Sequence, residues 1–107
     1  MSRNQIVLSG VICTEEPIRY TPAGLPVLQM ELDHRSEQIE VSIPVKIELV
    51  MKVKAVGEIA QEIARLPLGT EIVVKGFLAR TSRRSDAAVL HVNSYKLMKE
   101  VNHGTTV

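Results

Sequence analysis

The sequence has few aromatic side chains, a single cysteine and no long hydrophobic run. Tyr20, Phe77 and Tyr95 are its three aromatic residues, and tryptophan is absent. The lone Cys13 excludes an internal disulfide and a cysteine zinc site, and we expect it to be a small buried hydrophobic residue. No apolar stretch reaches the ~18 residues of a membrane helix, and no leader-like segment follows Met1, so we expect a soluble, cytoplasmic protein.

Motifs for catalysis, metal binding and nucleotide binding are also missing. The adjacent carboxylates of Glu15 and Glu16 lie on an expected turn and point different ways. His34, His91 and His103 are scattered without the spacing of metal ligands. The sequence contains neither GxxxxGK[ST] nor GxGxxG. We therefore expect no enzymatic activity, no cofactor and no metal.

The length of 107 residues predicts one domain with a single modest core. An apolar content of 45% indicates a folded chain. We expect this domain to occupy residues 1–101 and to be followed by a polar, frayed tail at 102–107.

Basic charge is concentrated in the second part of the chain. Residues 1–70 contain seven basic and nine acidic side chains, whereas residues 71–107 contain six basic and three acidic ones. Residues 75–84 contain four Lys or Arg and no Asp or Glu. Such a cluster is typical of a phosphate-binding surface, although a basic loop can also be merely solvated.

Period-two alternation and turn residues predict an all-β chain with one helix. The helix is indicated by apolar residues at helical spacing between Val56 and Leu66, and Pro67 ends it. A hairpin tip is expected at Thr21-Pro22-Ala23-Gly24, and a second strand is expected to end near 34–36. The expected strands cover residues 4–14, 28–33, 39–53, 72–78 and 87–98.

Three strands, one short helix and two strands predict a five-stranded OB-fold barrel, with the helix between strands 3 and 4. Gly10 within the first strand is typical of a barrel corner. An SH3-like barrel or a ferredoxin-like domain is the alternative, but the latter needs two crossover helices and one is visible.

The third expected strand is unusually long and has one apolar face. Alternate residues from Ile39 to Val53 are apolar, which predicts one buried and one solvated face. Pro44 cannot donate to a sheet, so we expect a bulge or an edge there and a strand that extends beyond the barrel. This apolar face, together with the apolar first strand, predicts a homodimer.

A barrel of this type binds nucleic acid on the face of its second and third strands and on the flanking loops. The loop at 81–86 places Arg83 and Arg84 beside that face, and Arg35 is expected to cap the loop between strands 2 and 3. Tyr20 is the aromatic residue whose position suggests base stacking, whereas Phe77 is expected more often in the core and Tyr95 is ambiguous. The predicted DNA-binding residues are Tyr20, Arg35, Lys46, Lys52, Arg80, Arg83 and Arg84.

Several motifs resemble one family when they are taken in order. They are Leu8-Ser9-Gly10, Thr21-Pro22-Ala23-Gly24-Leu25-Pro26, His34-Arg35-Ser36 and Gly69-Thr70-Glu71-Ile72-Val73-Val74-Lys75-Gly76-Phe77-Leu78. Together they resemble the primosomal replication protein N (PriB) family, which is itself similar to bacterial single-stranded DNA-binding protein. The segment Ser82-Arg83-Arg84-Ser85 looks most like betaproteobacterial members.

The resemblance implies a homodimer of OB-folds that binds single-stranded DNA, contacts the primosomal helicase PriA and helps to reload the replicative helicase. Enteric members have aromatic residues where this chain has Ile43 and Glu48, and Asp33 stands where some relatives have a basic residue. These departures favour weaker DNA binding and a larger share of helicase contact. Two alternatives therefore stay open: a protein adaptor in the primosome, and a general single-stranded DNA-binding protein.

Overall fold

The computed structural model describes residues 2–98, which form six strands and one helix. With the two-residue β2 set aside, the element order matches the predicted three strands, helix and two strands. The expected tail at 102–107 lies outside the described residues. Within residues 2–98, no helix has the length and apolar character needed to cross a membrane. The elements are β1 (Ile6–Glu15), β2 (Arg19–Tyr20), β3 (Pro26–Glu40), β4 (Ile43–Val56), α1 (Glu58–Ala64), β5 (Glu71–Ser82) and β6 (Ser85–Leu97).

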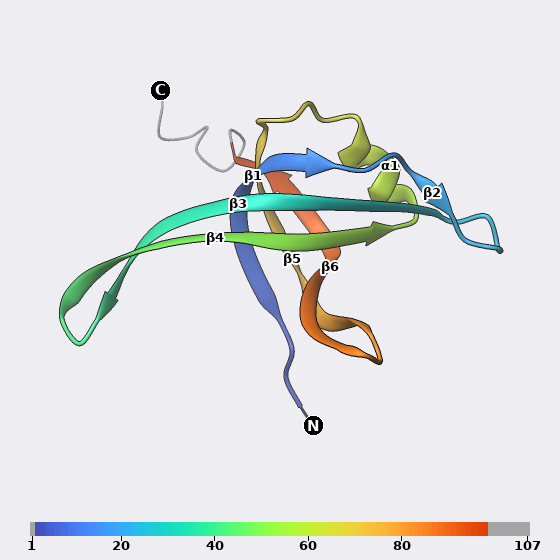
Figure 1. Cartoon of the computed structure of the whole chain (residues 1–107). Helices are drawn as coiled ribbons and strands as arrows, with labels where there is room; N and C mark the ends of the chain where they lie inside the picture. Colours follow the sequence, from blue (N-terminus) through green and yellow to red (C-terminus); the bar gives the residue numbers. More distant parts are fainter. Residues whose placement is uncertain (1, 99–107) are drawn as a thin grey trace.

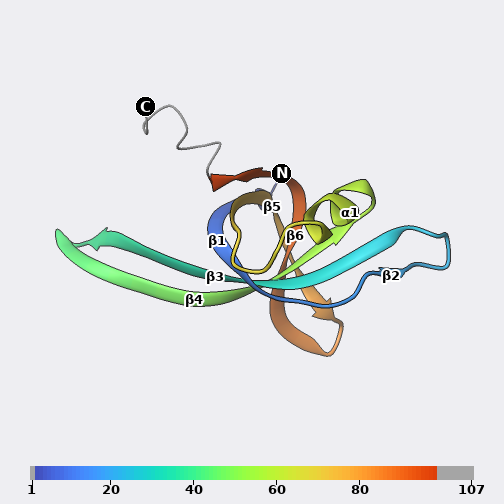
Figure 2. The ribbon, with the colours of Figure 1, turned by 90° about the horizontal axis from the view of Figure 1, so that it is seen from above.

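The five long strands close into a barrel because β1 pairs along two edges. Its first half runs antiparallel to β5, and its second half runs antiparallel to β3. Figures 1 and 2 show β1 bending as it passes from one partner to the other. On the opposite side β4 and β6 pair in parallel, with Val53 beside Leu90 and Lys54 beside His91. This closure confirms the predicted OB-fold architecture.

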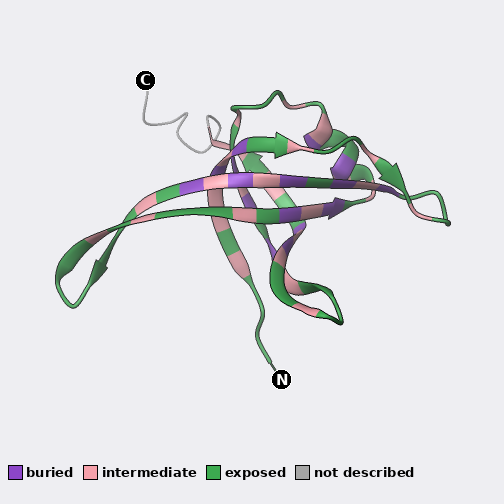
Figure 3. Cartoon of the chain, in the orientation of Figure 1, coloured by how far each residue is buried: buried purple, intermediate pink, exposed green. Residues whose placement is uncertain are grey.

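The core is built from alternate positions of each strand and from one side of the helix. In β3 the buried residues are Leu28, Met30 and Leu32. The helix α1 covers one end of the barrel with Ala60 and Ile63, both fully buried. Figure 3 shows the buried positions gathered where the strands cross and on α1. The buried apolar cluster is Ile12, Leu28, Met30, Leu32, Val53, Ala55, Ala60, Ile63, Ile72, Val74, Leu90 and Val92.

Cys13 is exposed, so the prediction of a buried cysteine is wrong. The register of β1 against β3 shifts between Ile12, which faces Leu32, and Thr14, which faces Glu31. Cys13 is therefore the extra residue of a β-bulge. Because Ile12 faces the core, the alternation of β1 places Cys13 outside, where its thiol donates to the carbonyl oxygen of Glu31 at 3.4 Å.

β3 and β4 form one long hairpin that turns at Val41 and Ser42. Their φ angles of 50° and 63° are both left-handed, as a type I′ two-residue turn requires. The predicted strand end near 34–36 and the strand start at 39 are therefore wrong, because β3 continues to Glu40 and β4 begins at Ile43. Neither valine nor serine signals such a turn, which usually contains Asn-Gly or Asp-Gly.

The distal half of this hairpin extends beyond the barrel, as predicted (Figures 1 and 2). There β4 pairs with β3, while its pairing with β6 involves Val53 and Lys54 only. Pro44 faces Ile39 in a regular register, so it lies at an edge and not in a bulge. The expected buried face is buried at its barrel end, where Val53 is 1% exposed, whereas Ile43 is 62% exposed.

Gly76 lies where β5 and β6 come closest. A Cβ atom at this position would overlap the carbonyl oxygen of His91, and the register of the two strands shifts between Lys75 and Gly76. Gly10 is a milder case, because a Cβ atom there would lie 3.0 Å from the Cβ of Leu32. Both glycines permit the sharp strand crossings that close the barrel.

Candidate nucleic-acid interface

The outer face of the β3–β4 hairpin carries three of the predicted DNA-binding residues. Because Leu28 and Leu32 face the core, the odd-numbered positions of β3 face outward. Opposite residues of an antiparallel pair share a face, so the register places Lys46 and Lys52 on the same side as Arg35. Arg35 lies well inside β3, so the expectation that it caps a loop is wrong.

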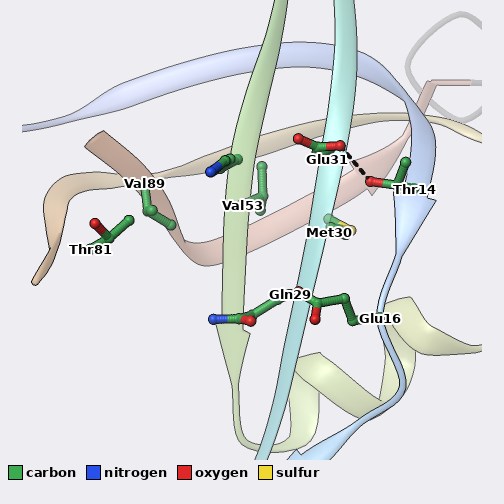
Figure 4. A pocket seen from close by; sticks show the side chains of 9 residues that line it. Thr14, Glu16, Gln29, Met30, Glu31, Val53, Thr81 and Val89 are labelled. Atoms are coloured by element: carbon green, nitrogen blue, oxygen red, sulfur yellow. Dashed lines mark hydrogen bonds between the residues drawn. The ribbon is translucent and has the colours of Figure 1, made fainter. Parts of the chain in front are cut away.

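A groove of 410 Å³ crosses this face (Figure 4). Its centre is formed by β3 and β4, and the arm made by β5 and β6 flanks it on one side. At the other side the hydroxyl of Thr14 donates to Glu31 Oε1 at 2.8 Å, which connects the end of β1 to β3. The groove is lined by Thr14, Glu16, Gln29, Met30, Glu31, Lys52, Val53, Thr81 and Val89.

Two of the three lysines of the hairpin stand opposite a carboxylate, and the third, Lys54, faces Gln29. Lys52 is the cross-strand partner of Glu31, and Lys46 is the partner of Glu37. Directly opposite side chains have Cβ atoms about 5 Å apart, close enough for opposite charges to attract. The hairpin therefore offers less net positive charge to a phosphate chain than its lysine content indicates.

Arg35 interacts with two carboxylates. Its Nε and Nη2 atoms each lie 3.4 Å from an oxygen of Asp33, and Nη1 lies 3.9 Å from Glu48 Oε1. The hydrogen bonds to Asp33, then the charges of Asp33 and Glu48, raise the pKa of Arg35 above its ordinary value. Because the side chain is 71% exposed, these ion pairs are weak and a phosphate can replace the carboxylates.

The β5–β6 turn presents two adjacent arginines, Arg83 and Arg84. Both are exposed, and no ion pair within the described chain involves either one. Arg80 lies in β5, two positions before the end of that strand. Its Nη1 atom is 3.7 Å from Asp86 Oδ1 and donates to the carbonyl oxygen of Arg83 at 3.5 Å. The predicted loop at 81–86 is thus a tight turn between Ser82 and Ser85, and its two arginines are the least neutralised cations of the predicted site.

The structure does not bring all predicted residues together. Lys46 lies near the tip of the β3–β4 hairpin, which projects in a different direction from the β5–β6 turn in both views (Figures 1 and 2). Lys52 lies in the groove. A DNA strand that contacts Lys46 and the Arg83–Arg84 turn must therefore follow the barrel surface between them.

Tyr20 lies in β2, the short strand that pairs with the start of β3. It pairs with Pro26 and is 65% exposed, and the predicted turn that follows it is confirmed by a hydrogen bond from Gly24 N to Thr21 O at 2.8 Å. A cavity of 150 Å³ beside the ring is also lined by Gln29, a residue of the groove. The position of Tyr20 is therefore compatible with stacking against a base at one end of the groove.

The two other aromatic residues differ in their surroundings. Tyr95 packs against the core, and its hydroxyl donates to Glu62 Oε1 of α1 at 3.2 Å. Phe77 is 38% exposed, and its ring stacks on His91 with centroids 5.0 Å apart and planes 16° apart. Phe77 was expected in the core, but its odd position in β5, between inward-facing Gly76 and Leu78, turns the ring outward. The period-two alternation of β5 was the feature of the sequence that could have predicted an outward ring at position 77.

Two titratable groups have shifted pKa values near this face. Burial, and then the charge of Lys54, lowers the pKa of His91. Burial raises the pKa of Glu15, whose Oε2 atom is buried without a hydrogen-bond partner. Within residues 2–98, no group of three or more His, Cys, Asp and Glu side chains is placed to hold a metal ion. The face thus offers ammonium, guanidinium, amide and ring groups, which suit a phosphate chain and its bases.

Comparison with known proteins connects this geometry to one family. A family model described as "another single-strand binding protein family" matches residues 4–94. Replication restart protein PriB of Nitrosomonas europaea is 37% identical over 98 residues, which cover 92% of this chain and 91% of that protein. The PriB protein of Bordetella pertussis is 40% identical over 89 residues, 83% of each chain.

Solved structures show the same relationship. The structure of PriB from Ralstonia solanacearum superposes with a TM-score of 0.81 at 27% identity, over 90% of this chain and 98% of that one. The single-stranded DNA binding protein from Thermus aquaticus gives a TM-score of 0.71 at 22% identity, over 89% of this chain and 50% of that one. The second similarity concerns the fold.

Proposed function

Because the chain belongs to the PriB family of replication restart proteins, we propose that it binds single-stranded DNA during replication restart. The observation that carries this proposal is the open groove of 410 Å³ beside an arm that ends in two exposed arginines. A groove lined by polar groups and flanked by cations is typical of OB-folds that bind single strands.

The proposed binding mode relies mainly on charge. Arg83 and Arg84 contact phosphates directly, and Arg80 does so after releasing Asp86. Arg35, Lys46 and Lys52 contribute as their carboxylate partners exchange for phosphate, and Tyr20 stacks against a base at the far end. This mode predicts moderate affinity that falls steeply with salt.

We also propose that the protein is a homodimer that contacts the primosomal helicase PriA and helps to reload the replicative helicase. The dimer is supported by exposed apolar side chains on the face of the distal hairpin opposite to Arg35, namely Ile43 and Leu49. Such a surface is typical of a protein interface. Sedimentation should give about twice the chain mass of 11.8 kDa, and a monomer at micromolar concentration would contradict the dimer.

A second function, that of a protein adaptor with weak DNA binding, is favoured by the carboxylates on the hairpin. Glu31, Glu37 and Glu48 each stand opposite a cation, so the hairpin face is close to neutral. In this alternative the basic turn contacts the helicase.

Fluorescence anisotropy with a labelled oligonucleotide at low and moderate salt separates the two functions. Binding at low salt that weakens strongly at moderate salt supports the DNA-binding function. Absence of binding at low salt, combined with capture of the helicase in a pull-down, supports the adaptor function and contradicts the proposed site.

A further inference from the structure

Four outward side chains form a row across four neighbouring strands. Gln29 of β3 is the cross-strand partner of Lys54 of β4, Lys54 is the parallel partner of His91 of β6, and His91 faces Phe77 of β5. The row combines an amide, an ammonium group and two rings. None of the charge or turn signals in the sequence singles out this combination.

The ring pair is accessible from the outer surface. Phe77 retains 38% of its exposure although one side of it stacks on His91. Its outward neighbours along β5 are Lys75 and Ala79, and Ala79 is too small to cover a phenyl ring. An exposed, pre-stacked ring pair is an apolar surface suited to a third flat ring.

The ring pair also adjoins the groove. Gln29, one end of the row, is a groove residue. Val89 precedes His91 by two positions on the same outer face of β6, and it lines the groove together with Thr81. Lys54 lies between Gln29 and the rings, where its charge affects His91. A strand lying in the groove therefore passes within reach of both the rings and an ammonium group.

From this juxtaposition we propose that Phe77 and His91 form a base-stacking platform of the single-stranded DNA site, with Lys54 binding the adjacent phosphate. The proposal rests on the proposed function and adds a second stacking position on the opposite side of the groove from Tyr20. Base–aromatic stacking is tolerant of sequence, because every base has a π-face. The platform therefore recognises a nucleobase as such.

The test compares two oligonucleotides of equal length, oligothymidylate and an abasic backbone, by anisotropy at one low salt concentration. The wild-type protein should bind the oligothymidylate at least about fivefold more tightly, the low end of what stacking supplies per base. Phe77→Leu should lose about fivefold of this preference, the share of one stacking position, and keep its abasic affinity. Leu68→Ala, an exposed apolar side chain in the turn after α1, is the control and should retain the preference.

A second variant gives an independent readout. The chain has no tryptophan, so Phe77→Trp introduces a single indole whose fluorescence should be quenched by oligothymidylate and less so by the abasic oligonucleotide. Leu68→Trp should show no such change. An unchanged base preference in folded Phe77→Leu, or an indole at position 77 that does not respond to the base, overturns the platform. Wild-type protein that binds both oligonucleotides equally refutes the platform and stacking at Tyr20 but leaves DNA binding intact. Wild-type protein that binds neither refutes the proposed function as well.

Discussion

Removal of the two arginines at the β5–β6 turn should weaken DNA binding and its salt dependence by a calculable amount. Arg83 and Arg84 are exposed and have no carboxylate partner in the described chain. For single strands, log K falls with log salt by about 0.7 per neutralised phosphate, so ~4 contacts give a slope near −3. The double variant Arg83→Ala/Arg84→Ala loses two contacts, and its slope should be about −1.4. Each contact contributes about fivefold at ~0.1 M salt, so affinity should fall about 25-fold.

The assay is anisotropy of a labelled oligothymidylate at four or more salt concentrations. Arg65→Ala/Lys96→Ala is a matched control, because it removes the same net charge from the C-cap of α1 and the end of β6. Figure 1 shows both segments at the opposite end of the barrel from the turn. The control should keep its slope. Equal losses in both double variants would mean that the field of the whole protein drives binding, and an unchanged slope in the turn variant would refute direct phosphate contacts.

Four further outcomes are expected. Tyr20→Ala should lower affinity in the same titrations without changing the slope, since stacking releases no counterions; a flatter slope would contradict stacking. Buried His34 donates from Nδ1 to Ser9 O at 2.7 Å and accepts at Nε2 from Ser36 Oγ at 2.8 Å. His34→Ala should therefore lower the free energy of unfolding, measured in urea, by about 1–3 kcal/mol. A loss below ~0.5 kcal/mol would contradict this role. The pKa of His91 is lower in the folded protein than in the unfolded chain, so the free energy of unfolding should also fall as pH drops through 6.5. His91→Gln should remove part of that fall. An identical pH profile in this variant would refute the lowered pKa of His91. Finally, native Cys13 should react with thiol reagents at a rate near that of the denatured chain, and strong native protection would contradict its exposed position.

The fold could be predicted from the sequence because its strands are half-buried and alternate cleanly. Leu28, Met30 and Leu32 are buried as the pattern indicates, and Ala60 with Ile63 seal the barrel end. The predicted strand boundaries were wrong where the backbone changes direction at residues that look ordinary in the sequence. The turn at 41–42 has an ordinary apolar and polar pair, and the bulge at residue 13 leaves both Cys13 and Thr14 exposed after buried Ile12. Backbone geometry of this kind depends on strand pairing and leaves little local trace.

The site was harder to predict because its charge depends on register. The sequence shows the lysines of β4, but it does not show that the turn at 41–42 places Glu31 opposite Lys52 and Glu37 opposite Lys46. A two-residue turn placed one residue earlier would shift the pairing by two positions, so that Lys52 would face Gln29 and Lys46 would face Arg35 instead of their present carboxylates. Among the predicted DNA-binding cations, those left without such partners are Arg83 and Arg84 of the short β5–β6 turn. We therefore expect DNA affinity to depend on Arg83 and Arg84 more than on the larger number of cations along the hairpin.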